Sequence, residues 1–216
     1  MKIGILGGTF NPIHVAHLRI AEEVRDRFDL AEIIFMPAAA PPHKPLAGDL
    51  PFESRYEMVR RAIAGNPFFS LSDIEAQRGG KSYSIDTLRT LRHERATDEF
   101  FFIIGSDSFL DFGSWRDYGG FFDYCNIVVV ERPGAVIAAL DRVLPVAIVH
   151  EFCYYAPEQR LAHRSGYSVY YLEGLPLAIS SSAIREQARL GRSIRYLVPD
   201  AVEHYIKEQR LYANAG

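Results

Sequence analysis

Two histidines stand three residues apart near the start of the chain, directly after a glycine-rich turn. A short apolar run, Ile3 to Leu6, leads into Gly7-Gly8-Thr9-Phe10, and His14 and His17 follow. Residues with this spacing share one face of a helix, so both imidazoles should project from its first turn. The amino end of a helix offers unpaired N–H groups and a partial positive charge, and imidazoles there add donors or cations. Such an arrangement is suited to binding a polyphosphate.

A second group of this kind lies late in the chain, where Ile179 is followed by three serines, Ala183, Ile184 and Arg185. If Ser181 or Ser182 caps a helix, Arg185 lies about one turn into it. A cation in that position is unfavourable against the helix dipole unless an anion is bound nearby. Serine hydroxyls, free N–H groups and an arginine fork therefore predict a second phosphate site, with a plain helix cap as the alternative.

A proline-rich segment at about residues 37–51 carries His43 and Lys44 between prolines. Prolines cannot continue a helix or a central strand, so the segment predicts a long loop of the kind that often covers a binding site. A stiff loop that closes could deliver the Lys44 ammonium to a phosphate at low entropic cost. The alternative is a lysine that is merely solvated.

An apolar run from Phe100 to Ile104 ends in Gly105 and Asp107, and the only tryptophan, Trp115, follows. A carboxylate at the end of a strand can accept hydrogen bonds from ribose hydroxyls, and an indole can stack on a ring. The alternatives are a helix cap for Asp107 and core packing for Trp115.

Apolar runs that alternate with amphipathic segments predict an α/β protein with a mainly parallel sheet. Ligands of such sheets bind outside the carboxyl ends of the strands, where the glycine turn and Asp107 both fall. The expected strands are Lys2–Leu6, Glu32–Met36, Phe69–Ser72, Phe100–Ile104, Ile127–Glu131, Pro145–His150 and Ser168–Leu172. The expected helices are Val15–Phe28, Glu53–Ala64, Ile85–Glu94 and Asp200–Gln209.

Composition narrows the class of protein. A chain of 216 residues can form one domain with a substantial core, and its net charge of −3 gives no general attraction to nucleic acid or membranes. The two cysteines, Cys125 and Cys153, support neither a disulfide scaffold nor a zinc site. No stretch is long enough for a membrane span or a signal peptide, so we expect a soluble cytoplasmic protein. Neither a dinucleotide fingerprint nor a P-loop is present.

The two phosphate-binding motifs together resemble the nucleotidyltransferase superfamily that carries an H-x-G-H and an I-S-S-x-x-[RK] signature. Within that superfamily the chain is most similar to the bacterial nicotinate-nucleotide adenylyltransferases. Two positions depart from the pattern, because Ala16 replaces the usual glycine between the histidines and Asn11 stands where an aspartate is common. The closer match rests on residues 41–44, 83–88, 105–107, Trp115, 131–133 and 168–174.

The resemblance implies a Rossmann-like, doubly wound sheet of the nucleotidyltransferase type. Residues 1–216 would form a single nucleotidyltransferase domain, with an active-site loop at about 37–51 and a small C-terminal helical part from about 180. The family joins ATP to nicotinate mononucleotide and releases pyrophosphate, which is a step of NAD biosynthesis. Mg²⁺ is then expected, held through the ATP phosphates and by no protein ligand.

The resemblance also implies a role for each candidate residue. The catalytic set would be His14, His17, Lys44 and Arg185, with His17 near the α-phosphate. The ATP-binding set would add Gly7, Gly8, Thr9, Phe10, Gly105, Asp107, Ser181 and Ser182. Nicotinate mononucleotide would be bound by Thr9, Lys44, Thr87 and Trp115.

Two other interpretations remain open at this point: another transferase of the superfamily that acts on phosphopantetheine or transfers a cytidylyl group, and a non-catalytic nucleotide-binding module. A class I aminoacyl-tRNA synthetase shares the histidine signature, but this chain is too short for one and lacks a Lys-Met-Ser-Lys-Ser-like loop. The sequence leaves open whether the protein forms a homo-oligomer, and no residue can be named that distinguishes nicotinate from nicotinamide.

Overall fold

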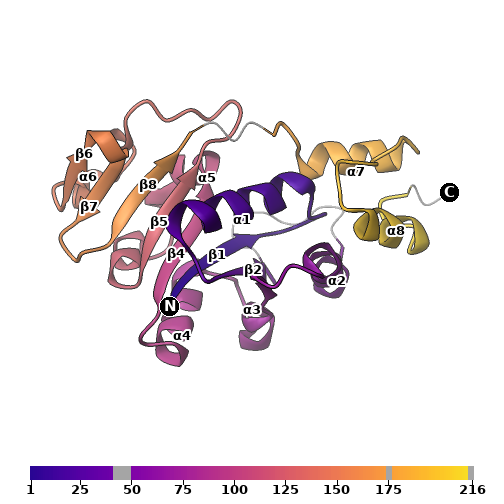
Figure 1. The fold of residues 1–216 in the computed structure, drawn as a ribbon, viewed down its shortest axis with the longest axis horizontal. Coiled ribbons are helices and arrows are strands. Elements are labelled where there is room, and N and C mark those ends of the chain that lie inside the picture. Colours follow the sequence, from indigo (N-terminus) through magenta and orange to yellow (C-terminus); the bar gives the residue numbers. More distant parts are fainter. Residues whose placement is uncertain (41–49, 174–176, 214–216) are drawn as a thin grey trace.

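The structure is a computed structural model that describes residues 1–40, 50–173 and 177–213. Within these ranges one sheet has the order β3-β2-β1-β4-β5-β8-β7-β6 (Figure 1). The six strands from β3 to β8 are parallel to their neighbours, whereas β7 and β6 run antiparallel at one edge. The strands are β1 (Lys2–Gly8), β2 (Glu32–Pro37), β3 (Phe69–Leu71), β4 (Glu99–Gly105), β5 (Cys125–Val130), β6 (Phe152–Tyr155), β7 (Arg160–His163) and β8 (Ser168–Leu172).

Helices cover both faces of the sheet. Side chains alternate across each strand, so that Ile3 and Ile5 of β1 pack toward one face while Ile33 and Phe35 of β2 pack toward the other. The long helices are α1 (Val15–Phe28), α2 (Phe52–Ile63), α4 (Ser84–Glu94), α7 (Ser181–Arg189) and α8 (Asp200–Glu208). The short ones are α3 (Ile74–Arg78), α5 (Ser106–Leu110), η1 (Phe112–Ser114), η2 (Tyr118–Asp123), η3 (Leu140–Arg142), α6 (Val146–Val149) and η4 (Ala156–Glu158).

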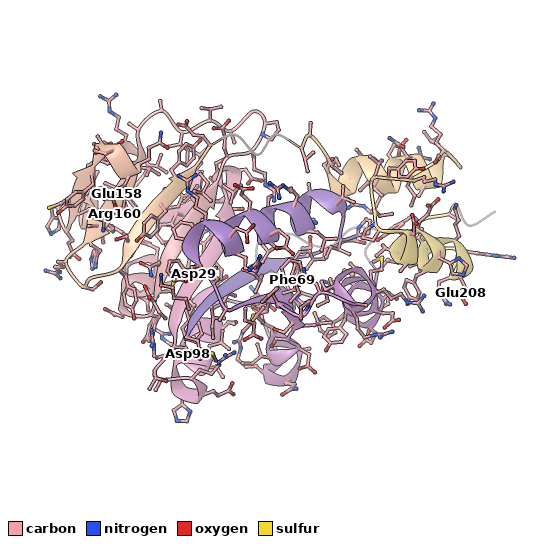
Figure 2. All side chains as sticks on the ribbon, in the orientation of Figure 1. Asp29, Phe69, Asp98, Glu158, Arg160 and Glu208 are labelled. Atoms are coloured by element: carbon pink, nitrogen blue, oxygen red, sulfur yellow. The ribbon has the colours of Figure 1, made fainter. Side chains whose placement is uncertain are left out.

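The two faces have different helices. Apolar side chains of α1, α2, α7 and α8 share one buried cluster with the sheet, and those of α4, α5 and η2 share the cluster on the opposite face. In Figure 1 α7 and α8 lie at the end opposite the β6–β7 pair. Figure 2 shows the same separation in side chains, with Glu158 and Arg160 at one end and Glu208 of α8 at the other. This is the doubly wound α/β fold that the sequence predicts.

The strand order creates a switch point beside β1. The chain passes from β1 to β2 and β3 on one side and then returns to β4 on the other side of β1. Connections therefore leave the carboxyl ends of β1 and β4 in opposite directions, which opens a crevice between them. At the amino ends of these strands, the Met1 amino group donates a hydrogen bond to Asp98 (2.7 Å), a residue labelled in Figure 2.

The prediction of a strand at Pro145–His150 is wrong. Val146–Val149 instead forms the short helix α6, and Val146 is 88% exposed. A short apolar run fits a strand or a helix segment equally well, and only burial decides between them. The antiparallel strands β6 and β7 were not expected, because the exposed Cys153, Tyr154 and Tyr155 of β6 give no alternating pattern.

The expected strands Lys2–Leu6, Glu32–Met36, Phe69–Ser72, Phe100–Ile104 and Ser168–Leu172 match β1, β2, β3, β4 and β8 within one or two residues. The long expected helices match α1, α2, α4 and α8 to within one residue at each end. In the described ranges no helix is both long and apolar enough to cross a membrane.

Candidate active site

A cleft of about 760 Å³ opens at the switch point, over the carboxyl ends of β1 and β4. One wall carries the turn after β1 and the paired histidines, a second carries Gly105 and Asp107, and a third carries Trp115. The cleft therefore collects side chains from segments that lie about a hundred residues apart in the sequence. Its polar and apolar walls are suited to a ligand with both phosphate groups and rings.

The turn between β1 and α1 is held in place through its carbonyl groups. The Thr9 carbonyl accepts a hydrogen bond from the fully buried Arg55 of α2 (2.8 Å), and the Asn11 carbonyl accepts one from Arg185 of α7 (2.8 Å). The Ser181 hydroxyl donates to the Pro12 carbonyl (2.8 Å). Two helices from distant parts of the chain thus hold the backbone of this turn, whose first residues line the cleft.

The two histidines form a stacked pair. His14 is the residue that caps the amino end of α1, His17 lies in its first turn, and their ring centroids are 3.6 Å apart. Burial, together with the nearby charge of Arg132, lowers the pKa of His14 to about 4. Burial, followed by His14 and Arg132, holds the pKa of His17 well below its usual range. Both rings are therefore neutral near pH 7, so each can offer one N–H donor and one acceptor nitrogen but no positive charge.

Helix α7 begins one residue earlier than expected. Ser180 is its cap, because the Ser180 hydroxyl accepts a hydrogen bond from the Ala183 N–H (3.2 Å). The expectation that Ser181 or Ser182 caps the helix is wrong. Ser181 instead lines the cleft through its contact with the β1–α1 turn, whereas Ser182 is exposed and is not part of the cleft lining.

At the end of β4, the Asp107 carboxylate faces the guanidinium of Arg132. The Asp107 Oδ1 atom lies 3.6 Å from Arg132 Nε. A Cβ atom on Gly105 would lie 2.3 Å from that Oδ1 and 2.6 Å from that Nε, so a residue with a side chain would displace the pair. Glycine at position 105 is therefore required for this ion pair to lie over the strand end.

The third wall brings Trp115 and Glu75 to the cleft but not Thr87. Trp115 is half-buried and packs edge-on against Phe102 (6.3 Å between ring centroids). Thr87 is buried behind the wall, where its hydroxyl donates to Glu75 Oε1 (2.9 Å) and accepts from Arg78 (3.1 Å). The Thr87 side chain supports the wall, and Glu75 faces the cleft in its place.

A family model described as cytidylyltransferase-like matches residues 5–187. A curated protein of Geotalea uraniireducens, named as a probable nicotinate-nucleotide adenylyltransferase, is 73% identical over 215 residues and 100% of each chain. One of the same name from Geobacter sulfurreducens is 66% identical over 100% of each chain. This chain belongs to the nicotinate-nucleotide adenylyltransferase family.

Solved structures of the family have the same fold. The nicotinic acid mononucleotide adenylyltransferase of Plasmodium falciparum, in a complex with NaAD, superposes with a TM-score of 0.75 at 21% identity. The alignment covers 98% of this chain and 97% of the other. A putative nicotinate-nucleotide adenylyltransferase of Vibrio parahaemolyticus gives a TM-score of 0.67 at 16% identity, over 99% and 96% of the two chains.

Most of the residues that the family resemblance implicated line this cleft. They are Gly7, Gly8, Thr9, Phe10, His14, His17, Gly105, Asp107, Trp115 and Ser181. Thr87 contacts Glu75 of the lining, whereas Arg185 donates to the Asn11 carbonyl just beyond it, and Ser182 lies outside the cleft. Lys44 lies outside the residues that the structure describes.

Two residues with a place at the site, Arg55 and Glu75, were not singled out from the sequence, and Arg132 was noted only within the family match at 131–133. Arg55 lies inside the amphipathic helix α2 and Glu75 in the five-residue helix α3, so nothing local distinguishes them. Arg132 gave a usable signal, because it follows β5 at the carboxyl end where ligands of such sheets bind.

Proposed function

We propose that this protein transfers the adenylyl group of ATP to nicotinate mononucleotide, forming deamido-NAD and pyrophosphate. The observation that carries this function is the single cleft in which the paired histidines, the Gly105–Asp107 strand end and Trp115 face one another, in a chain 73% identical to a relative of that name. A dinucleotide product needs such a cleft, with a phosphate region between two places for rings and riboses.

The proposed reaction is a displacement at phosphorus. An oxygen of the mononucleotide phosphate forms a bond to the α-phosphorus of ATP, and the bond from that phosphorus to the bridging oxygen of the β-phosphate breaks. The electron pair of the broken bond leaves with pyrophosphate. The attacking phosphate is already ionised near pH 7, since its second pKa is about 6, so no general base is required. Catalysis then depends on alignment and charge stabilisation.

The phosphate region is supplied by the β1–α1 turn and the histidines. Nδ1 of His17 accepts a hydrogen bond from the His14 backbone N–H (3.2 Å), so the proton of the neutral ring is on Nε2. His17 would donate this proton in a hydrogen bond to the α-phosphate, and His14 would support it from the stacked position. Gly7, Gly8, Thr9 and Phe10 would line the junction of the two nucleotides.

Arg185 and Ser181 would act on the phosphates through the turn that they hold, since both donate to its carbonyl groups. By the family resemblance, Lys44 and Ser182 would bind the β- and γ-phosphates that leave; Ser182 lies outside the cleft lining and Lys44 outside the described residues.

The two ends of the cleft would hold the two nucleosides. Gly105 and Asp107 would meet the adenosine ribose, because Asp107 is exposed at the cleft and its carboxylate can accept from hydroxyl groups. Trp115 would stack on the nicotinate ring. Thr87 would position that end indirectly, through Glu75.

Mg²⁺ would enter with ATP. The described residues contain no group of three His, Cys, Asp or Glu side chains that could hold a metal ion. Phosphate oxygens and water would therefore hold the ion, whose charge would offset that of the phosphates. With ATP as substrate, we place the reaction in the cytoplasm.

The test is to mix the protein with ATP, Mg²⁺ and nicotinate mononucleotide and to follow pyrophosphate release and the dinucleotide product. Parallel reactions with nicotinamide mononucleotide and with phosphopantetheine measure the specificity. The expected result is turnover that is fastest with nicotinate mononucleotide. Turnover only with phosphopantetheine would point to the other transferases of the superfamily, and ATP binding without any turnover would point to a nucleotide-binding module.

A further inference from the structure

Arg132 lines the same cleft as the histidine pair and lies beside the Asp107 carboxylate. Its backbone N–H donates to the Ser106 hydroxyl (2.8 Å), which fixes the residue beside the end of β4. Its Nε atom is 3.6 Å from Asp107 Oδ1, and its charge is near enough to act on both His14 and His17. Arg132 is therefore placed where the ribose end of the cleft meets the phosphate region.

The guanidinium of Arg132 is not fully satisfied by the protein. Its Nε atom is buried and has no hydrogen-bond partner within the described ranges, and the Asp107 contact is too long for a hydrogen bond. A buried donor without an acceptor costs stability, more so when the group is charged. An arginine kept in this state next to a ligand cleft has donors available for a ligand that carries the acceptors.

Among the described residues, the arginines Arg116 and Arg185 have partners, and the two histidines are neutral. Arg116 is the second arginine of the described cleft lining, and it pairs with Asp86 (3.2 Å) over the Tyr83 ring. Arg185 donates to the Asn11 carbonyl. Since both histidines are neutral, Arg132 is the fixed positive charge beside them among the residues that the structure describes.

We propose that Arg132 is a further catalytic residue, whose guanidinium binds the α-phosphate of ATP and stabilises the charge that develops there. This role rests on the proposed adenylyl transfer. Before ATP binds, the ion pair with Asp107 keeps the guanidinium in position. When ATP binds, the ribose hydroxyls can donate to Asp107 in place of Arg132, and the α-phosphate can accept from Arg132 in place of Asp107. The guanidinium presents its donors in a rigid planar fork, a fixed geometry that a lysine ammonium does not provide.

The primary test compares Arg132→Gln with Arg142→Gln, an exposed arginine of η3 that gives the same change of charge. We expect kcat of R132Q to fall by about 10²-fold or more, the usual cost of one transition-state donor. R142Q should keep the wild-type kcat. An NMR titration of the free proteins should show that the histidine pKa values rise in R132Q only. Wild-type kcat or unchanged histidine pKa values in R132Q would overturn the proposal.

A second test addresses the contact with the α-phosphate. For one diastereomer of ATPαS, sulfur replaces the oxygen that Arg132 would bind, so the wild-type enzyme should be slowed more than R132Q is. Equal slowing of both enzymes with both diastereomers would contradict this contact.

If R132Q does not fold, the variant Arg132→Lys keeps the charge but loses the fork, and its kcat should fall by about tenfold. A wild-type kcat for R132K would count against the proposal.

Binding of α,β-methylene ATP, measured by calorimetry, separates this proposal from the proposed function. R132Q should bind the analogue at least fivefold more weakly than R142Q does, whether or not nicotinate mononucleotide is the acceptor. A wild-type protein that binds the analogue but does not form the dinucleotide would contradict the proposed function alone. Equal binding by the two variants would contradict the role of Arg132 alone.

Discussion

The backbone N–H of His14 donates a hydrogen bond to Nδ1 of His17, 3.2 Å away. This bond fixes both the orientation of the His17 ring and its tautomer, because a neutral ring that accepts at Nδ1 carries its proton on Nε2. The helix start therefore leaves Nε2 as the ring nitrogen that can donate. Under the proposed function, His17 would act as a neutral donor and not as a general base.

The substitution His17→Ala should lower kcat by about 10²-fold or more, since it removes one donor to the transition state. His17→Gln restores an N–H donor on a longer and more flexible side chain, and its kcat should lie between those of the wild type and the alanine variant. Steady-state kinetics with saturating substrates give the values. A wild-type kcat for a folded H17A would exclude this residue from the mechanism.

Stability should depend on pH through the same pair. The pKa of His14 is about 4 in the folded protein and 6.5 in a model peptide, so the unfolded state binds more protons between these values. The contribution of neutral His14 to the free energy of unfolding is fully present above about pH 6.5. It is lost as the pH falls toward 4, by about 3 kcal/mol in all. Urea denaturation at pH 7.5 and at pH 5 measures the loss, which should be smaller in His14→Asn. Equal pH dependence in the two proteins would contradict the shifted pKa.

The first half of the site could be predicted because its signals are local. The glycine turn, both histidines and the amphipathic pattern of Val15–Phe28 lie within thirty residues, and the structure has α1 over that same range. Local spacing decides which side chains share a helix face, so the sequence was sufficient there. Gly105 and Asp107 were found for a similar reason, since they end a strongly apolar strand.

The rest depends on contacts between distant segments. Nothing near Arg55 indicates that it reaches the Thr9 carbonyl, 46 residues away in sequence. Thr87 is buried with its hydroxyl bonded to Glu75, which lies in another helix, and the sequence gives no sign of that contact. The cap of α7 was missed because three consecutive serines each fit a cap equally well, and only the backbone decides that it is Ser180.

The substitution Gly105→Ala should disturb ATP binding with little effect on the fold. Its methyl group would lie within 2.6 Å of both Asp107 Oδ1 and Arg132 Nε, so these flexible side chains must move apart. We expect KM for ATP to rise by about tenfold, as for the loss of one charge-assisted hydrogen bond. Gly119→Ala is the control, because its added methyl would make only an ordinary 3.6 Å contact with Ile148. Unchanged kinetics in G105A would remove the Asp107–Arg132 pair from the ATP site.

The substitution Arg185→Met should weaken ATP binding and turnover together. Arg185 holds the Asn11 carbonyl at 2.8 Å, so its loss should loosen the turn in front of the histidines. We expect KM for ATP to rise and kcat to fall, each by about tenfold, for a charged hydrogen bond worth roughly 1.5 to 3 kcal/mol. The control is Arg189→Met on the same helix, where the arginine is exposed and pairs only with Glu186 in the described structure. If both variants keep wild-type kinetics, the contact with the turn has no role in the reaction.

The substitution Arg55→Met should lower the stability of the protein as well as its activity. Arg55 is 1% exposed, and its guanidinium donates to the Thr9 carbonyl (2.8 Å) and the Leu50 carbonyl (3.3 Å). Loss of these bonds takes a charged donor from two partly buried carbonyl groups, which costs about 1 to 3 kcal/mol. Arg60→Met is the matched control, because this exposed arginine of the same helix pairs with Glu57 on the surface. Urea denaturation should show the larger loss in R55M, and equal losses in the two variants would mean that the buried contacts do not hold the turn.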